Sequence, residues 1–411
     1  MNGGEQRHII AIDLLRFACA MAVLAYHFWM VFPLATSSAT YMFGLSNPLP
    51  TGAAPWTASG WVGVEIFFVI SGYVIALSAE HADRATFARG RILRLVPAGL
   101  ICAVLTALVL VLSGALPATE AATRLITTIT MLPFGPRIDG AWWTLQVETS
   151  FYLAVACVLR ADHSNGRRLQ LLGIGLTMWS LLFYIQALAR GHVPDMIGSI
   201  ATLVLLSHGM FFALGIALRS IETRGWGKGR AIAVAAALAV SLIEVVATGF
   251  RHDGAGGIRQ SAAIPAALFL AGVFVIARAP RWTMSGRPAR VLRRVGALTY
   301  PLYLVNQVIG AATVAGLVAI GCPASAALIL GACAMLALAA LISLSLEPHV
   351  RGGISALLDG SMKPQRSRFA QLARPRALPL QSNFDRPLLQ HPHPQAESQS
   401  KHVLSRGDDS S

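Results

Sequence analysis

The chain has 411 residues, of which 55% are hydrophobic and only 13% are charged, and its formal net charge is +14. Soluble domains carry about a quarter charged residues, so this composition excludes a chain built mainly of soluble domains. The apolar residues occur in long runs typical of membrane-spanning helices, without the alternation of an outer-membrane barrel. We assign the excess of basic residues to membrane topology and predict no nucleic-acid partner.

Ten apolar segments are long enough, or nearly so, to cross a bilayer as helices. The sequence therefore predicts an all-α, polytopic integral membrane protein with about ten transmembrane helices. The predicted spans are 9–33, 60–79, 96–116, 141–160, 169–189, 196–218, 231–250, 262–279, 296–320 and 324–346. The stretch 124–134 is a candidate partial or re-entrant element.

Lys and Arg are unevenly divided between alternate loops, with 18 on one side of the predicted membrane and five on the other. Because cytoplasmic loops collect these residues, the bias places both termini in the cytoplasm of a multi-pass bacterial inner-membrane protein. The composition changes after the last span and becomes rich in Pro, Gln, Ser and Arg. We expect a transmembrane domain over 1–350 and a basic, disordered cytoplasmic tail over 351–411.

The first span carries three ionisable residues, Asp13, Arg16 and His27, which are costly in a bilayer and therefore mark a candidate site. On an ideal helix, His27 lies about 20° from the direction of Arg16 and about 16 Å farther along the axis. Asp13 is close enough to pair with Arg16. This helix is therefore expected to carry an arginine near the cytoplasmic surface and an imidazole in the outer half of the membrane.

The second span contains Glu65 near its outer end, and Gly60, Gly63 and Gly72 permit close contact with other helices. A structural helix-to-helix hydrogen bond is the competing explanation for this carboxyl group.

The fourth span begins with Trp142 and Trp143, which we interpret as a marker of the outer membrane interface. Counting residues from that marker places Glu148 in the outer half of the membrane, at a depth similar to those of His27 and Glu65. These three side chains are therefore expected to converge. A structural hydrogen bond is again the alternative for Glu148.

Two arginines, Arg91 and Arg94, lie in the loop that precedes the third span. Their spacing of three residues presents forked donors of a geometry suited to phosphate groups, although topology-setting charges are a common explanation for such a pair. His208 and Glu244, in the sixth and seventh spans, are interpreted as packing residues. The combination of an outer carboxylate and histidine cluster with an inner arginine cluster favours a functional site over these separate explanations.

These segments resemble the membrane acyltransferase-3 family, whose members acylate surface polysaccharides, nodulation factors, macrolides and related hydroxyl compounds with acyl-CoA. The resemblance extends over about 340 residues and rests on the order of its motifs. Matching positions in the first half are Asp13, Arg16, His27, Gly60, Gly63, Glu65, Phe67, Phe68, Ser71, Gly72, Arg91, Arg94, Pro97, Trp143, Leu145, Val147 and Glu148, and near the end Glu347 and Pro348.

The chain departs from the family pattern at several positions. Thr144 replaces a serine and Thr149 a second glutamate, so only Glu148 is carried over. Pro301 and Asn306 stand where a serine and a histidine are usual. A catalytic role of that late histidine is therefore not transferable to this chain.

The resemblance implies an O-acyltransferase that moves an acyl group, with acetyl as the expected one, from acyl-CoA to a carbohydrate or glycolipid hydroxyl at the cell envelope. Arg16, Arg91 and Arg94 would bind the acyl-CoA co-substrate. His27 would act as a general base or carry the acyl group, and Glu148 would orient it. Supporting or acceptor-side residues would be Asp13, Glu65, Ser71 and Trp143. No tightly bound cofactor and no metal site are predicted.

Two alternatives remain open from the sequence. The acceptor could instead be a cytosolic small molecule, such as a macrolide, acylated by the same chemistry on the inner side. A membrane transporter or flippase would also carry ionisable residues in its helices, but the two halves of this chain show no clear repeat.

Overall fold

The computed structural model describes residues 8–34, 37–45, 49–50, 52–131, 135–161, 165–190, 204–252 and 261–372. The chain divides into two compact units, Met1–Ser361 and Met362–Ser411. Every candidate site residue lies in the first unit.

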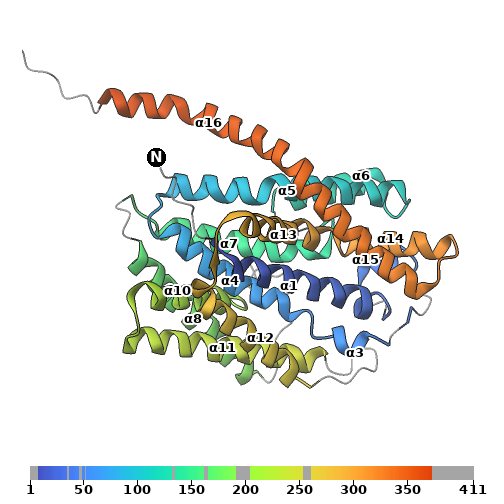
Figure 1. Ribbon diagram of the computed structural model, residues 1–411, viewed down its shortest axis with the longest axis horizontal. Helices are drawn as coiled ribbons and strands as arrows, with labels where there is room; N and C mark the ends of the chain where they lie inside the picture. The colour runs from blue at the N-terminus through green and yellow to red at the C-terminus, as the bar shows by residue number, and fades with distance from the viewer. Residues whose placement is uncertain are drawn as a thin grey trace, which may run out of the picture. The chain divides into compact units, whose positions relative to one another are not determined.

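Helices make up most of the described chain (Figure 1). The first half contains α1 (Ile10–Tyr26), α2 (Ser38–Met42), α3 (Ala54–Thr57), α4 (Val62–Ala79), α5 (Arg84–Leu112), α6 (Ala118–Ile129), α7 (Trp143–Val158) and α8 (Gly166–Ala189). The second half contains α10 (Gly209–Arg224), α11 (Lys228–His252), α12 (Ala263–Arg278), α13 (Gly286–Val305), α14 (Val308–Ala319), α15 (Ala324–Leu341) and α16 (Glu347–Leu372).

Short irregular turns adjoin several of these helices. They are the π turns His27–Val31 and Ile342–Leu346 and the 3-10 turns Gly140–Trp142 and Ala279–Arg281. The two strands, β1 (His8–Ile9) and β2 (Thr283–Met284), pair antiparallel with His8 opposite Met284. This pair joins the start of α1 to the segment that precedes α13.

Within the part of the chain that the structure describes, seven helices are long and apolar enough to cross a membrane, and α13 and α14 together form an eighth candidate span bent by 73°. The prediction of an all-α, polytopic membrane protein is therefore confirmed. The number of ten spans and the location of both termini stay predictions. Residues 196–203 of the predicted sixth span lie outside the described residues. The stretch 124–134 overlaps α6, whose 12 residues are too few to cross the hydrocarbon layer.

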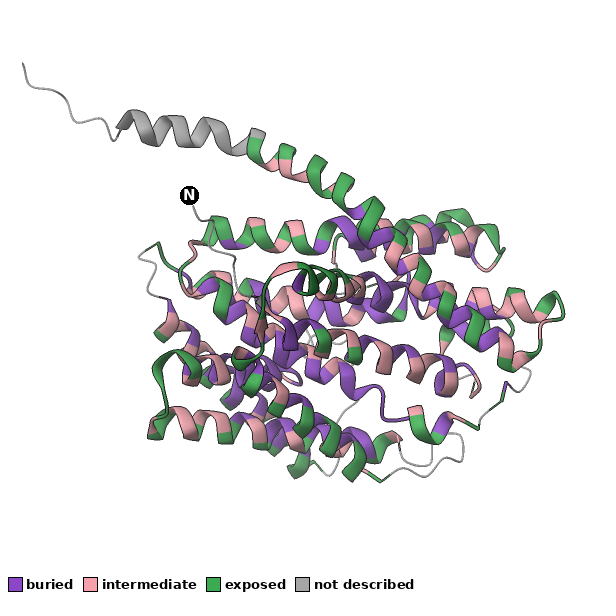
Figure 2. Ribbon diagram, viewed as in Figure 1, coloured by how far each residue is buried: buried purple, intermediate pink, exposed green. Residues whose placement is uncertain are grey.

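Buried residues concentrate along the centre of the bundle, where α1 and α4 run, and exposed residues lie on the outward faces of α5, α8 and α11 (Figure 2). The core consists of two large hydrophobic clusters, one around α4, α7 and α10 and the other around α5, α13 and α15. Helix α1 contributes residues to both clusters. It therefore joins the two halves of the bundle.

Glycines allow α4 and the turn just before it to pack directly against two neighbouring backbones. A Cβ atom at Gly60 would lie 2.2 Å from the carbonyl oxygen of Ala22 in α1, and one at Gly72 would lie 2.1 Å from the carbonyl oxygen of Phe212 in α10. Neither distance is possible for a real side chain, so these contacts require glycine. The expectation of close helix contacts at these glycines agrees with the structure.

The predicted domain boundary at residue 351 falls within α16, which continues to Leu372. Arg89 of α5 donates hydrogen bonds to Ser355 (2.8 Å) and to Asp359 (3.1 Å). The first part of this helix is therefore held against the bundle. Residues 373–411 of the predicted tail lie outside the described residues.

Candidate active site

Two cavities of similar size lie inside the bundle, one of about 460 Å³ and the other of about 510 Å³. The first, the arginine cavity, is lined by four arginines and three carboxylates: Asp13, Arg16, Arg94, Glu148, Arg293, Glu347 and Arg351. The second, the histidine cavity, is lined by three histidines, two glutamates and one arginine: His27, Glu65, His208, Glu244, Arg251 and His252. Eight of the nine candidate residues predicted from the sequence line one of these cavities. Six of them are ionisable, and the other two are Ser71 and Trp143.

A thin wall separates the cavities. Val64 of α4 and Tyr303 of α13 line both of them. The ring of Phe67, one turn along α4 from Val64, lies edge-on to the ring of Tyr303 with centroids 6.2 Å apart. The two cavities are therefore adjacent compartments with a common boundary made of side chains.

In the arginine cavity, Glu148 is held by hydroxyl groups from two helices. Ser71 of α4 donates a hydrogen bond of 2.9 Å to its Oε1 atom, and Tyr152 donates to the same oxygen from one turn farther along α7. Arg16 and Arg94 are close enough to interact electrostatically with this carboxylate. Glu148 therefore neutralises part of the charge of two arginines that would otherwise repel each other.

Arg91 does not share the environment of Arg94. Its guanidinium lies over the rings of Phe87 and Tyr152, 5.5 Å and 5.7 Å from their centroids, and it is not among the residues that line the arginine cavity. Residues three apart on a helix differ in direction by about 60°, which is enough to turn one toward the cavity and the other toward the aromatic rings. The expected pairing of Arg91 with Arg94 at one site is therefore not found.

Sequence reasoning missed Arg293 and Arg351, which complete the arginine cavity. Arg293 belongs to a run of basic residues at the start of α13, and Arg351 forms an ion pair with Glu347 one turn earlier in α16. Both were counted as ordinary loop or tail charges. The signal that could have identified Arg351 is its spacing of four residues from Glu347, which is part of a family motif.

In the histidine cavity, His27 begins the π turn that follows α1. Such turns are rare and occur often at functional sites. Its Nδ1 atom lies 2.5 Å from the Oδ1 atom of Asn306, in the break between α13 and α14. Asn306, which stands where the family usually has a histidine, is thus the hydrogen-bond partner of this imidazole.

Glu65 faces the same cavity from α4 and is only 6% exposed. Its Oε2 atom has no hydrogen-bond partner among the described residues, and the Nε1 atom of the neighbouring Trp61 likewise has none. A buried polar atom without a partner costs free energy, so such atoms commonly mark a place where a ligand or water binds. The cavity therefore offers an unused acceptor and an unused donor.

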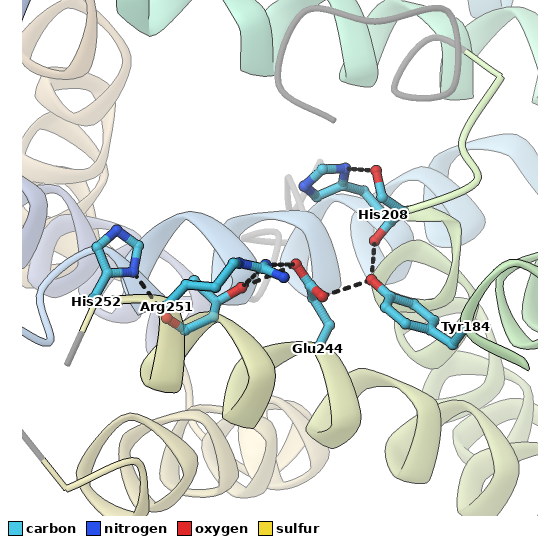
Figure 3. A network of polar contacts seen from close by, with 7 residues as sticks. Tyr184, His208, Glu244, Arg251 and His252 are labelled. Atoms are coloured by element: carbon cyan, nitrogen blue, oxygen red, sulfur yellow. Dashed lines mark hydrogen bonds and ion pairs between the residues drawn. The ribbon is translucent and has the colours of Figure 1, made fainter. Parts of the chain in front are cut away.

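A polar network from α8 and α11 forms another side of the histidine cavity (Figure 3). Glu244 accepts hydrogen bonds from Tyr184 (2.7 Å), Thr248 (2.9 Å) and Arg251 (2.8 Å). Arg251 remains partly exposed, with 37% of its side-chain surface accessible. Glu244, which the sequence suggested was a packing residue, thus positions a cationic group at the cavity.

His208 also lines this cavity and was likewise interpreted as a packing residue. Its Nδ1 atom lies 2.7 Å from the hydroxyl oxygen of Ser207, and its ring packs 5.1 Å from Trp143 and 5.5 Å from Phe68. Trp143 is therefore part of the cavity wall. Its expected role on the acceptor side stays a prediction.

The expected convergence of His27, Glu65 and Glu148 is only partly found. His27 and Glu65 share the histidine cavity, but Glu148 lies in the other one, beside a serine six residues farther along α4 than Glu65. Trp142, from which the depth of Glu148 was counted, is 2% exposed and packs in the protein core, so it does not serve as a marker of the lipid interface.

Asp139 connects the start of α7 to the helix break. It lies before the first turn of α7, outside the candidate spans, and its carboxylate accepts from the backbone N–H groups of Ala141 (2.7 Å) and Val308 (3.1 Å). Burial raises the pKa of this carboxyl group to about 6, although the two backbone N–H groups act in the opposite direction. Asp139 thereby fixes the segment that carries Asn306 against the segment that carries Trp143.

The geometry separates two chemical capabilities. The arginine cavity can bind a polyanion, because guanidinium groups form paired hydrogen bonds with phosphates. The histidine cavity can bind a hydroxyl compound and hold an imidazole near it, and imidazole exchanges protons near neutral pH. A group passed from the polyanion to the hydroxyl would cross the wall at Val64 and Tyr303.

Comparison with known proteins identifies the family of the chain. No curated protein and no solved structure shows significant similarity to the chain. The family model described as "Acyltransferase domain", of the acyltransferase-3 family, matches residues 9–346. The match includes every lining residue of the histidine cavity, and all those of the arginine cavity except Glu347 and Arg351. With most of its length matched, this multi-pass membrane protein belongs to the acyltransferase-3 family of membrane acyltransferases.

Proposed function

We propose that the protein transfers an acyl group, with acetyl as the first candidate, from acyl-CoA to a hydroxyl group of a carbohydrate or glycolipid at the cell envelope. The observation that carries this proposal is the pair of adjacent cavities, one rich in arginine and the other containing His27. A transferase with one anionic and one hydroxyl substrate needs these two environments side by side.

The arginine cavity is assigned to the donor. Arg16, Arg94, Arg293 and Arg351 would bind the phosphates of CoA, and the four guanidinium groups outnumber the three carboxylates among them. Glu148 and Asp13 keep the arginines in place while no donor is bound. The pantetheine arm would extend along α1 toward Tyr303, which brings the thioester carbonyl to the wall between the cavities.

The histidine cavity is assigned to the acceptor. The free Oε2 atom of Glu65, the Nε1 atom of Trp61 and the guanidinium of Arg251 would hold the hydroxyl groups of the acceptor. His27 would remove the proton of the attacking hydroxyl as its oxygen bonds to the thioester carbon. The C–S bond then breaks, and the thiolate of CoA leaves and takes up a proton.

The proposed location is the inner membrane of a bacterium, with the donor entering from the cytoplasm. The basic residues of the predicted cytoplasmic loops include Arg94 and Arg293, which line the arginine cavity. His27 lies about 16 Å of helix rise beyond Arg16, in the half of the membrane that faces away from these residues. The acylated product would therefore appear on the outer side.

The proposal is tested with the full chain in proteoliposomes that contain an extract of envelope glycans. Radiolabelled acetyl-CoA is supplied on one side at a time, and label in the glycan fraction and free CoA thiol are both measured. We expect transfer for the wild type, loss of at least about 100-fold for His27→Ala, and little change for His81→Ala, an exposed histidine outside both cavities.

The same experiment separates the rival functions. A transporter would move glycan across the membrane without releasing CoA thiol. An enzyme acting on a cytosolic acceptor would deliver labelled product to the side on which the donor was supplied. Transfer that persists in His27→Ala at the wild-type rate would refute the assignment of the histidine cavity.

A further inference from the structure

The break between α13 and α14 places an asparagine beside His27. The chain bends by 73° there, and Asn306 and Gln307 are the two residues between the helices. Asn306 is fully buried, with 0% of its surface exposed. A buried amide at a helix break must have its donors and its acceptor satisfied, so its contacts report its role.

The donor side of this amide is fixed by the backbone. Its Nδ2 atom donates to the carbonyl oxygens of Leu302 (3.1 Å) and Tyr303 (2.8 Å), both in the last turn of α13. Rotating the amide by 180° would place its oxygen against those two carbonyl oxygens. Both hydrogen bonds that its N–H groups donate would then be lost. The Oδ1 atom is therefore held in the direction of His27, 2.5 Å from Nδ1.

This contact determines which nitrogen of His27 carries the proton. An amide oxygen only accepts hydrogen bonds, so the Nδ1 atom must be the donor. In a neutral imidazole the other nitrogen, Nε2, then carries the lone pair. Asn306 is the one side chain with a hydrogen bond to the His27 ring among the described residues.

The backbone of His27 is fixed as well. The N–H group of Phe32 donates to the His27 carbonyl oxygen at 2.8 Å and closes the π turn. With the backbone and Nδ1 both held, the position of Nε2 is fixed as well, and His27 is among the residues that line the histidine cavity.

We propose that Asn306 is a positioning residue, which holds His27 as the Nδ1–H tautomer and so presents Nε2 to the acceptor hydroxyl. The use of Nε2 as a base depends on the proposed function, but the tautomer itself does not. The amide oxygen thereby orients the ring and selects its tautomer, as an acceptor oxygen on Nδ1–H does for other histidine bases.

The tautomer is measured directly by nitrogen NMR. The full chain is labelled with ¹⁵N-histidine in lipid nanodiscs, and the His27 signals are those lost in His27→Gln. We expect a protonated Nδ1 and an unprotonated Nε2 in the wild type. Asn306→Asp, which keeps an acceptor oxygen, should retain this pattern, whereas Asn306→Leu, similar in size but without an acceptor, should lose it.

A matched control is provided by Asn165, which is also 0% exposed but lies between α7 and α8, outside both cavities. Its amide accepts from the N–H of Arg160 and donates to the carbonyl of Ala82. Asn165→Leu removes an amide that is as deeply buried as that of Asn306, and the His27 signals should not change. If Asn306→Leu fails to fold, the wild type and Asn306→Asp still decide the tautomer.

Kinetics give the second readout. Asn306→Leu should lower kcat for acyl transfer about 10- to 100-fold and leave the KM for acetyl-CoA within about twofold, because the arginine cavity is unchanged. Asn306→Asp should recover most of the loss. A protonated Nε2 in the wild type, or the same tautomer in Asn306→Leu, overturns the inference even if transfer is observed. Absence of transfer with the expected tautomer overturns only the proposed function.

Discussion

The contact between α1 and α4 sets the distance between the two helices that carry His27 and Glu65, and Gly60→Ala tests its importance. A Cβ atom at this position would lie 2.2 Å from the carbonyl oxygen of Ala22 and 2.9 Å from the Cβ atom of Tyr26. The first of these neighbours is backbone, so it cannot rotate away. The two helices must separate instead.

The size of the effect follows from these distances. To restore an ordinary distance between carbon and oxygen, the two helices must move apart by about 1 Å. Overpacking of this kind lowers the free energy of unfolding by about 1–3 kcal/mol. A displacement of about 1 Å between catalytic groups can lower a rate about 100-fold. At Gly63 the nearest atom, the carbonyl oxygen of Cys19, is 2.8 Å away, so Gly63→Ala should have a smaller effect.

The assay combines thermal unfolding of the purified protein in detergent with acyl transfer in proteoliposomes. Gly60→Ala should lower Tm by about 2–6 °C and transfer by about 100-fold. Gly316→Ala in α14 is the matched control, because a Cβ atom there meets nothing within 4 Å. Equal Tm values and equal rates for Gly60→Ala and Gly316→Ala would show that the close approach of α1 and α4 does not matter.

Three further results are expected. Arg94→Ala should raise the KM for acetyl-CoA about tenfold or more, because a phosphate loses a forked donor. Arg167→Ala, which changes an exposed residue outside the cavities, should leave the KM unchanged. Equal KM values for the two variants would remove Arg94 from the donor site. Arg251→Leu should destabilise the protein by about 2 kcal/mol in thermal unfolding, less than a fully buried pair because its side chain is 37% exposed, and an unchanged Tm would contradict this. Burial on folding raises the pKa of Asp139 to about 6, so the ionised form is disfavoured in the folded state. Tm should therefore fall as pH rises from about 4 to about 6. The same dependence of Tm on pH in Asp139→Asn would contradict this assignment.

The features that depend on a single helix were predicted most accurately from the sequence. The spacing of Arg16 and His27 on one helix, and the small residues of the second span, depend only on helical geometry and local packing. The structure accordingly places Arg16 and His27 at two cavities along α1 and puts Gly60 and Gly72 at helix crossings. These features could be predicted because each is a property of one helix.

Features that depend on how different helices are set in depth and direction could not be predicted. The depth of Glu148 was misjudged because a tryptophan in the protein core and one at a membrane interface look alike in a sequence. Glu244 and Asn306 gain their roles from contacts with residues 60 and 279 positions away in the chain. A single sequence contains no signal for such contacts.

The common wall of the two cavities has a consequence for the kinetics of the whole protein. Tyr303 lies three residues before Asn306, and its carbonyl oxygen accepts one of the amide hydrogen bonds, so one turn of α13 contacts the arginine cavity, the histidine cavity and the partner of the imidazole. A substrate that shifts this turn from one side alters the other side as well. Binding of the two substrates should therefore be cooperative, with each changing the affinity for the other by the same factor.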